Sequence, residues 1–345
     1  MPGAPGLDDP ALSTRVSTTT GNRPKRQHYV PRFYLEHFSD ENGQVWTYDS
    51  EGKSVRSAKP EQTAVETNFY STTNEQGEYH DDLENWLAEV ESNAAGLYPK
   101  VLKGEALEGD ERAKFAVFLA SLLGRSPAMV TAYAEMQGYA VQTPTRFAAA
   151  NPKIFDAQMD RYDEETGVTT SPEERSKLLE FMRDTSRYIL EVDKKRGLAA
   201  IGVTDSIAPI LNDMRWIVLE SPDQHIITSD NPLVRVTPPE TRHPIYRDGG
   251  FMNKSVEVYI PLSPTKSLAA FWSKDTTPSK HRIDKTRARH MNKLQAIYSE
   301  RYLFASRRDS GIEALSLKHH APGVRIRVSG QEHMAKVNVV RKPAK

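Results

Sequence analysis

The alternation of apolar and polar residues divides the chain into a helical middle and a C-terminal region of strands. In the middle, apolar residues recur every three or four positions, which places them on one face of a helix. We expect one helix from about His80 or Asp81 to Gly104, a second with Asp110 as its N-cap, and a third over residues 128–141. The second helix is apolar on most of its sides, so it should lie at the centre of the core.

The pattern changes to short β-branched and aromatic runs from Met214 onward. These runs are bounded by Pro, Asp, Asn and Gly, which is typical of strands. One helix, over residues 286–298, interrupts them. The expected strands cover residues 215–220, 225–228, 233–236, 256–260, 267–272 and 303–305. Consecutive strands after a block of helices indicate an α+β fold, in which the helical middle packs on a mostly antiparallel C-terminal sheet.

The ends of the chain bound one expected domain over residues 27–308. Residues 1–26 are rich in Pro, Gly, Ser and Thr, and this composition buries too little surface to offset chain entropy, so we expect a disordered leader. Downstream of the leader, residues 45–48 and 53–56 flank a polar turn and predict an N-terminal β hairpin. Residues 309–345 form an extension whose fold the sequence does not define.

The segment over residues 142–172 has the weakest pattern. It is polar and carries three prolines, so we expect an irregular and mobile excursion. At its end, Ser171, Pro172 and two acidic residues follow one another in the order that a helix start prefers. A further helix should therefore run from this point to about Ala200.

Composition restricts the chemistry open to the chain. Its 46 Lys and Arg residues balance 46 Asp and Glu residues, so no net charge draws it to nucleic acid or to an anionic membrane, although a local basic groove remains open. The absence of cysteine excludes disulfides, thiolate metal sites and a Cys nucleophile, and any metal would need His, Asp or Glu. No window approaches the roughly 18 apolar residues that span a bilayer, and no secretory signal is present. We expect a soluble cytoplasmic protein without membrane contact.

Familiar catalytic signatures are also missing. The sequence has no Gly-rich phosphate loop, no Gly-x-Ser-x-Gly and no His-Glu-x-x-His, which excludes the easily recognised NTPases, dinucleotide enzymes, serine hydrolases and zincins.

Short motifs of another kind are spread over roughly residues 27–305. They are His28-Tyr29-Val30-Pro31-Arg32-Phe33-Tyr34-Leu35, Asn68-Phe69-Tyr70, Thr228-Ser229-Asp230-Asn231-Pro232 and Pro261-Leu262-Ser263-Pro264. In this combination the chain resembles a bacterial family of unknown function with an N-terminal His-Tyr-Val-Pro motif. The resemblance implies no established activity, so it supplies positions and no mechanism.

The N-terminal motif contains two candidate site residues. His28 is a candidate general base or metal ligand, because imidazole transfers protons near neutral pH and often binds metals. A structural histidine that stacks on a neighbouring tyrosine and caps a turn is the open alternative. Arg32 can bind phosphate or carboxylate through two parallel hydrogen bonds, or form a structural salt bridge. Tyr29, Phe33 and Leu35 alternate as in a half-buried strand and are expected to pack in the core.

Asp230 and Asn231 form the second candidate group. They follow Ile226-Ile227, so they lie where a buried strand meets a tight turn, a place from which side chains often project into a cleft. Asp230 suits a metal ligand or general base there, and Asn231 suits a substrate contact. The alternative is structural, because Asp and Asn before Pro commonly bind nearby backbone N–H groups in turns.

Helical positions supply the remaining candidates. Glu84 and Glu91 are two helical turns apart, so both point to the flank of the apolar face, where a carboxylate reaches either a cleft or solvent. Arg125 ends an apolar helix, where a cation also favours the helix dipole, so anion binding and capping both fit. Asn292 is expected to anchor its helix to the sheet through hydrogen bonds.

Two hypotheses on function follow, and geometry separates them. The first is a metal-dependent hydrolase of phosphodiester bonds in nucleic acid or nucleotides, in which a divalent cation activates water. Its catalytic and metal-binding candidates are His28, Asp230 and Glu91, and its substrate-binding candidates are Arg32, Arg125 and Asn231. The second is a non-catalytic binding or interaction protein whose polar motifs are structural. Convergence of the three metal candidates favours the first hypothesis, and separate bonds to backbone favour the second.

Overall fold

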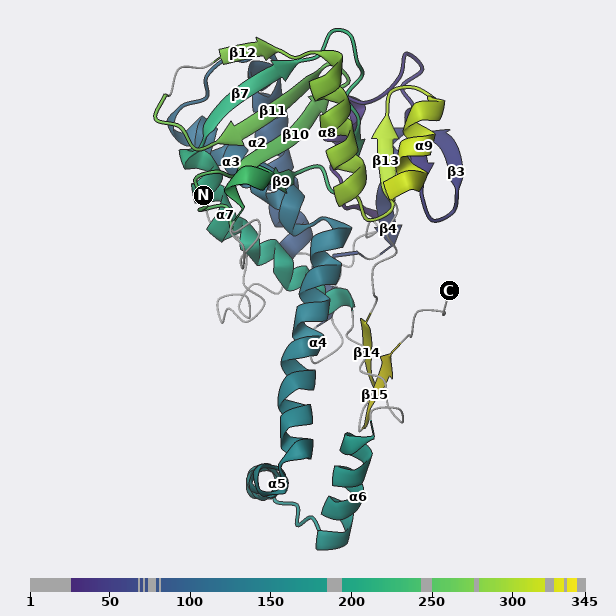
Figure 1. Cartoon of the computed structure of the whole chain (residues 1–345), viewed down its shortest axis with the longest axis vertical. Coiled ribbons are helices and arrows are strands. Elements are labelled where there is room, and N and C mark those ends of the chain that lie inside the picture. The colour runs from purple at the N-terminus through teal and green to yellow at the C-terminus, as the bar shows by residue number, and fades with distance from the viewer. Residues whose placement is uncertain are drawn as a thin grey trace. The chain divides into compact units, whose positions relative to one another are not determined.

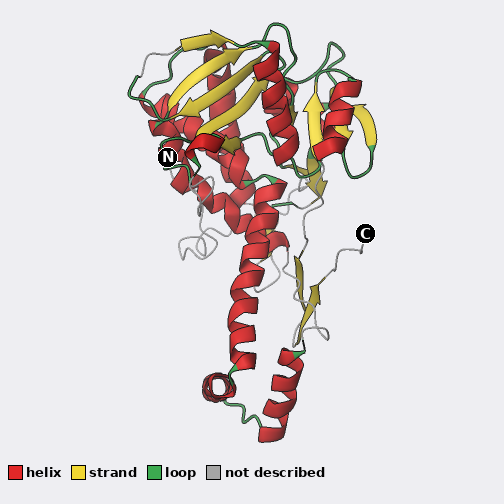
Figure 2. Cartoon of the chain, viewed as in Figure 1, coloured by secondary structure: helices red, strands yellow, loops and turns green. Residues whose placement is uncertain are grey.

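The computed structural model describes residues 26–67, 69–70, 72–73, 79–80, 82–184, 194–242, 250–275, 279–319, 326–331 and 334–339. It has the predicted α+β fold, with helices in the middle of the chain and antiparallel strands after them (Figures 1 and 2). Two compact units lie within residues 1–130 with 198–322, and within residues 131–197 with 323–345. The predicted leader lies outside the described residues except for Arg26. The single domain expected over residues 27–308 stays a prediction.

The first unit is built around a five-stranded sheet with the strand order β12-β7-β11-β10-β9. All neighbouring strands are antiparallel except β12, which is parallel to β7, so the mostly antiparallel C-terminal sheet is confirmed. Strand β12 was not predicted, because it is a short polar segment at the sheet edge. The strands are β7 (Arg215–Glu220), β9 (Val234–Val236), β10 (Glu257–Ser263), β11 (Lys266–Phe271) and β12 (Ser279–Arg282).

The two faces of this sheet pack on different helices (Figure 1). On one face, Val258, Ile260 and Leu268 join the main core, which also contains buried residues of helices α2 (Asp82–Lys103), α3 (Gly109–Gly124) and α7 (Val203–Asp213). On the other face, Tyr259 and Ala269 pack with helix α8 (Lys285–Tyr298). Successive residues of a strand point to opposite faces, so the same strands serve both layers.

A four-stranded sheet, β3-β2-β13-β8, joins the N-terminal hairpin to the C-terminal region. The predicted hairpin is confirmed as β2 (Val45–Asp49) paired with β3 (Ser54–Ala58). On its other side β2 pairs with β13 (Tyr302–Ala305), which in turn pairs with β8 (Thr228–Ser229). Helix α9 (Ser310–His319), which was not predicted, packs on the apolar cluster of this region.

The N-terminal motif is a strand followed by a short helix, so the predicted alternating strand is wrong beyond His28. Strand β1 (Arg26–His28) pairs with β4 (Val65–Thr67), and helix α1 (Arg32–Glu36) begins directly after Pro31. The fully buried Tyr34 hydroxyl donates to the Pro261 carbonyl at 2.7 Å, so the Thr228 hydroxyl, 2.8 Å away, must donate to Tyr34. The N-terminal motif therefore packs against the C-terminal strands.

The predicted helices of the first unit are present with small corrections. Helix α2 has the expected bounds, whereas α3 has Glu108 as its N-cap residue and places Asp110 in the first turn, where its charge still favours the helix dipole. No single helix in the described part of the chain has both the length and the apolar composition needed to cross a bilayer. The shorter elements are η2 (Pro60–Gln62), β5 (Thr72–Thr73), β6 (Tyr79–His80), η3 (Lys194–Gly202) and η4 (Pro239–Thr241).

The second unit contains helices where an irregular excursion was predicted over residues 142–172. Helix α4 (Pro127–Ala150) continues through Pro144, and α5 (Pro152–Thr166) and α6 (Pro172–Arg183) each begin at a proline. A proline at the first helical position sacrifices no intrahelical hydrogen bond, so two of the three prolines favour helices here. The unit also contains the hairpin of β14 (Ile326–Gln331) and β15 (Met334–Val339).

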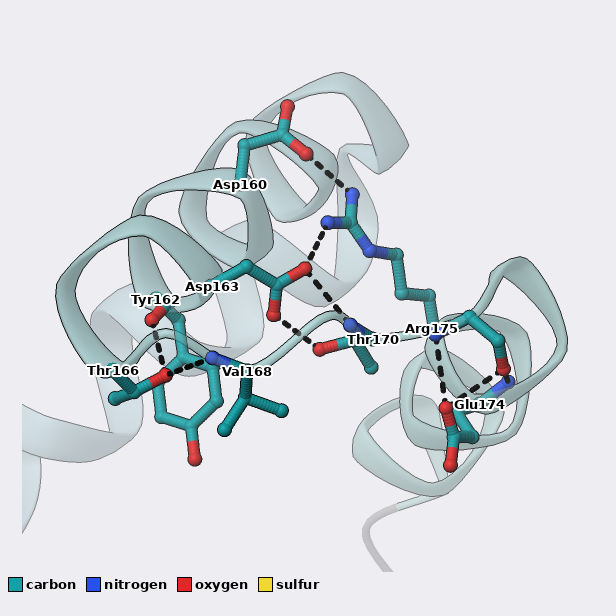
Figure 3. A network of polar contacts seen from close by, with 9 residues as sticks. Asp160, Tyr162, Asp163, Thr166, Val168, Thr170, Glu174 and Arg175 are labelled. Carbon is teal, nitrogen blue, oxygen red and sulfur yellow. Dashed lines mark hydrogen bonds and ion pairs between the residues drawn. The ribbon is translucent and has the colours of Figure 1, made fainter.

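A polar network joins α5 to α6 (Figure 3). Arg175 donates to Asp160 at 2.6 Å and to Asp163 at 2.7 Å, and Asp163 also accepts from the Thr170 backbone and hydroxyl. The predicted helix start is confirmed by a capping box between Ser171 and Glu174. The helix ends at Arg183, well before the predicted Ala200, and residues 185–193 lie outside the described part.

Candidate functional site

Asp230 is buried in the core and binds the backbone at the start of β13. Its side chain is 1% exposed and accepts three backbone N–H groups, from Glu300 at 2.9 Å, Arg301 at 2.7 Å and Tyr302 at 2.8 Å. Burial raises the pKa of Asp230 to about 7, and the three N–H donors oppose this rise because they stabilise the carboxylate. Both oxygens are occupied, so the carboxylate fixes the start of β13 and has little capacity left for a metal.

Asn231 continues the same structural role. Its amide donates to the Tyr298 carbonyl at 3.1 Å, and its backbone N–H binds the Ser229 hydroxyl at 3.2 Å. That hydroxyl also contacts the Gln295 side chain at 2.7 Å, so the turn is bound to helix α8. The predicted substrate contact of Asn231 gains no support from this geometry, because the residue is 8% exposed and its amide group faces α8.

Asn292 anchors α8 to the strand region, as the sequence predicted. Its side-chain oxygen accepts the Ile227 N–H at 3.1 Å, and its amide donates to the His225 carbonyl at 2.7 Å. One side chain therefore satisfies two backbone groups in the segment before β8. Together with Asp230 and Asn231, it makes the Thr228–Pro232 motif a junction between α8, β8 and β13.

Arg125 and Glu91 form an ion pair between the end of α3 and helix α2. The Arg125 side chain is fully buried, and its Nη1 donates to Glu91 Oε1 at 2.7 Å. Its Nε and Nη2 are buried without a hydrogen-bond partner among the described residues. Glu91 keeps 26% of its side chain exposed, so the carboxylate links a buried cation to the surface. The only part of this ion pair that reaches solvent is therefore the Glu91 carboxylate. The predicted direct contact of Arg125 with substrate is not supported, because the Arg125 side chain is fully buried.

His28 ends β1, and the charges of both members of this ion pair affect its pKa. Its Nε2 is 3.2 Å from the Pro60 carbonyl oxygen, which can only accept, so Nε2 carries the proton and Nδ1 is left as a base. Burial lowers the pKa of the imidazole, the Pro60 contact and Glu91 raise it, and Arg125 and Arg32 lower it further. The net pKa lies below the ordinary 6.5, so His28 is neutral at pH 7.

Arg32 is the exposed cation of the group. Its side chain is 55% exposed and forms ion pairs with Glu36 at 2.9 Å and Glu61 at 3.2 Å. Exposed pairs of this kind contribute only about 0 to 1 kcal/mol, so Arg32 can exchange them for another anion at little cost. Its positive charge also contributes to the lowered pKa of His28.

Two further residues, Gln27 and Tyr70, hold the site together, and the sequence did not single them out for this role. The buried Gln27 donates to Glu84 at 2.7 Å and accepts the Tyr70 backbone N–H at 2.6 Å. The Tyr70 hydroxyl donates to the His28 carbonyl at 3.0 Å, and Arg125 is close enough to lower the raised pKa of this buried tyrosine. The sequence offered two signals for these residues: Gln27 directly precedes His28, and Tyr70 belongs to the Phe69-Tyr70 motif.

Four of the six candidates are linked by contact or charge, and the other two are not. Arg125 pairs with Glu91, and the charges of Glu91, Arg125 and Arg32 all affect the pKa of His28. Asp230 and Asn231 belong to the α8 junction. No group of three or more His, Asp or Glu side chains in the described part of the chain could hold a metal ion. The predicted metal site of His28, Glu91 and Asp230 gains no support from this geometry, because each of the three side chains contacts a different partner.

Comparison with known proteins agrees with these landmarks. The profile of a family described as a protein of unknown function (DUF4238) matches residues 26–309. The chain belongs to this family. The match begins at the strand that carries His28 and ends just before α9, so it includes all six candidate residues. The expected membership in a family of unknown function is confirmed. No curated protein and no solved structure matches the chain.

Proposed function

We propose that the chain hydrolyses phosphodiester bonds in nucleic acid or nucleotides, with His28 as general base. The observation that supports this proposal is the lowered pKa of His28, whose Nε2 faces the Pro60 carbonyl at 3.2 Å and so leaves Nδ1 as the basic nitrogen. A base with a pKa below neutral is already deprotonated at pH 7 and can accept a proton from a nucleophile. The proposal needs no protein-bound metal at Asp230.

Each neighbour of His28 has a role in this scheme. Nδ1 takes the proton of the attacking water or hydroxyl, and the charge on the resulting imidazolium is stabilised by Glu91. Arg125 is a positioning residue, because its ion pair at 2.7 Å holds the Glu91 carboxylate in place. Arg32 leaves its exposed partners and neutralises the phosphate. The leaving oxygen receives its proton from the imidazolium, which restores neutral His28. The absence of cysteine fits the cytoplasmic location that we propose with this activity.

The test compares two histidines of the same segment. His28→Gln keeps a donor for the Pro60 carbonyl but removes the titratable nitrogen, so cleavage of a phosphodiester substrate should fall by about 100-fold or more. His37→Gln is the matched control, because His37 is also half-buried with a lowered pKa but only stacks on Tyr98 at 4.4 Å. Equal activity of the two variants would contradict the role of His28.

The second candidate is a non-catalytic binding protein. It is favoured by one observation, namely that the polar groups of the Thr228–Pro232 motif bind the chain's own backbone and α8. Under this alternative a nucleotide or oligonucleotide binds near Arg32 and is released unchanged. Calorimetric binding without any product after long incubation would favour it over the hydrolase.

A further inference from the structure

One segment of the chain carries a concentration of basic residues. Residues 280–293 contain six Lys or Arg residues and one Asp, although the formal net charge of the whole chain is zero. The segment comprises the end of strand β12 and most of helix α8, and the 14 residues of α8 include no Asp or Glu. A local cluster of positive charge on a neutral protein indicates a binding surface for an anion.

Three of these cations form a row on helix α8. Lys285, Arg289 and Lys293 are separated by four residues, so they follow one another along the same side of the helix. All three are exposed, and no ion pair among the described residues joins them to a carboxylate. The fourth cation of the helix, Arg287, lies 3.6 Å from Glu257. The three residues, which we call the α8 row, therefore present their charges to solvent.

The α8 row gives no stability to its own helix. Like charges four residues apart repel one another on a helix surface. Lys285 is also the first residue of α8, where a cation opposes the helix dipole. The arrangement therefore weakens the isolated helix, and an anionic partner would remove this repulsion.

Packing against the sheet holds the row outward. On another side of α8, Met291 and Leu294 pack with Tyr259 and Ala269 of the five-stranded sheet. Helix α8 lies over this sheet in Figure 1. The row can therefore contact a partner without any rearrangement of the fold.

The positive charge extends from α8 onto helix α9, which packs beside it. Burial and then the charges of Arg287 and Lys293 lower the pKa of His290, despite a nearby carboxylate. Burial, Lys293 and Lys318 likewise lower the pKa of His319 on α9. Lys293 thus acts on side chains of both helices, and the exposed Lys318 continues the basic surface beyond the row.

The chemistry of this surface favours nucleic acid as the partner. Successive cations of the α8 row are about 6 Å apart along the helix, and a duplex offers phosphates at high density along its length. A helix that binds a membrane surface turns its apolar side toward the lipid, but the apolar side of α8 is buried. A protein interface has an apolar core, whereas among the described residues of α8 Ile297 is the one exposed large apolar side chain.

We propose that the α8 row binds the phosphates of a nucleic acid backbone without reading its sequence. Lys and Arg contacts to phosphates fix the position of a nucleic acid and carry no sequence information. This assignment does not depend on the proposed hydrolase. A chain that binds nucleic acid without cleaving it would contradict the hydrolase and support the α8 row.

The salt dependence of binding to a labelled duplex, followed by fluorescence anisotropy of the full chain, tests the proposal. Three phosphate contacts predict a slope of log K against log salt of about −3 or steeper for a duplex, and of about −2 or steeper for a single strand. Each such contact contributes about eightfold at about 0.1 M salt relative to about 1 M. The triple variant Lys285→Gln, Arg289→Gln, Lys293→Gln should therefore bind about 100-fold more weakly at about 0.1 M salt, with a thermal midpoint that is unchanged or raised.

The matched control removes the same charge near strand β3 of the same unit. Lys53→Gln, Arg56→Gln, Lys59→Gln changes three exposed cations that likewise have no ion pair among the described residues. Its affinity should change by less than about threefold, because salt screens exposed charges beyond about 10 Å. Each single substitution in the α8 row should flatten the slope by about 1, which keeps the test valid if the triple variant unfolds.

Three results would overturn the proposal. They are the absence of saturable binding to either oligonucleotide, an equal loss of affinity in the control variant, and a slope that the α8 substitutions leave unchanged. Binding of the wild type to vesicles that contain phosphatidylserine, without binding to either oligonucleotide, would assign the row to a membrane surface instead.

Discussion

Replacement of Asp230 measures how much its three hydrogen bonds at the start of β13 contribute to stability. At about pH 8 the carboxylate is ionised, because burial raises its pKa only to about 7, and both oxygens then accept backbone N–H groups. Asp230→Asn keeps the shape but turns one acceptor oxygen into a donor. The less costly orientation places the amide nitrogen at Oδ1, which loses the bond from Glu300 N–H and keeps the other two.

The expected losses follow from the bonds that each variant breaks. One unsatisfied buried donor costs about 1 to 3 kcal/mol, so Asp230→Asn should lower the free energy of unfolding by about that amount. Asp230→Ala removes all three bonds and should cost about 3 to 5 kcal/mol. Urea titration measures both values, provided that the dependence on urea concentration is unchanged.

Asp284→Asn is the control for the Asp230 series. Asp284 caps α8 with a single bond to the Arg287 N–H at 2.7 Å, and Asn caps a helix about as well as Asp. Its loss should be a few tenths of a kcal/mol. If Asp230→Asn costs no more than this control, the three bonds do not hold the turn and the structural assignment of Asp230 is refuted.

Three further predictions concern the candidate site and its support. Glu91→Gln leaves the buried Arg125 without a counter-charge and should lower the free energy of unfolding in urea by about 3 kcal/mol. The control Glu84→Gln, on the same helix, should lower it by less than about 1 kcal/mol. Equal losses in the two variants would contradict the ion-pair argument. Gly124→Ala should destabilise the chain by about 1 to 3 kcal/mol, because the added Cβ would lie 3.0 Å from the Ala200 carbonyl oxygen; an unchanged thermal midpoint would refute this close approach. Because the pKa of His28 is lowered in the folded chain, the unfolded chain binds more protons than the folded chain just below pH 6.5, and the free energy of unfolding therefore falls as the pH drops below 6.5. Between about pH 7.5 and pH 5.5 the wild type should lose more stability than His28→Gln. Equal losses in the two proteins would contradict the lowered pKa.

Local patterns predicted those parts of the fold that local physics determines. The hairpin β2–β3, helix α2, most C-terminal strands and the helix start at Ser171 all follow from periodicity, turns and caps. The irregular structure predicted for residues 142–172 was wrong because the prolines were taken to interrupt helices. Pro152 and Pro172 instead occupy the first helical position, where proline is favourable. The strand predicted through Phe33 was wrong because Pro31 starts a helix instead.

The candidate site was predictable in its residues but not in its grouping. His28, Arg32, Glu91 and Arg125 were all selected from the sequence, but only tertiary packing pairs Arg125 with Glu91 and brings the charges of Arg32, Glu91 and Arg125 to bear on His28. The two interpretations of Asp230 stayed open in the sequence, because the same residue type serves a cleft and a turn, and only the partners at residues 300–302 favour the structural one. Those partners are about 70 residues away along the chain, so no local pattern shows them.

The most direct test of the proposed hydrolase is the pH dependence of phosphodiester cleavage by the wild-type chain in excess EDTA. A metal-independent His28 base predicts product formation, with kcat/KM falling at low pH through an apparent pKa below 6.5. Glu91 raises this pKa, so the same limb should lie at still lower pH in any active Glu91→Gln sample. Cleavage that appears only with added divalent cation, or no cleavage of RNA, DNA or a chromogenic diester at any pH, would contradict the account.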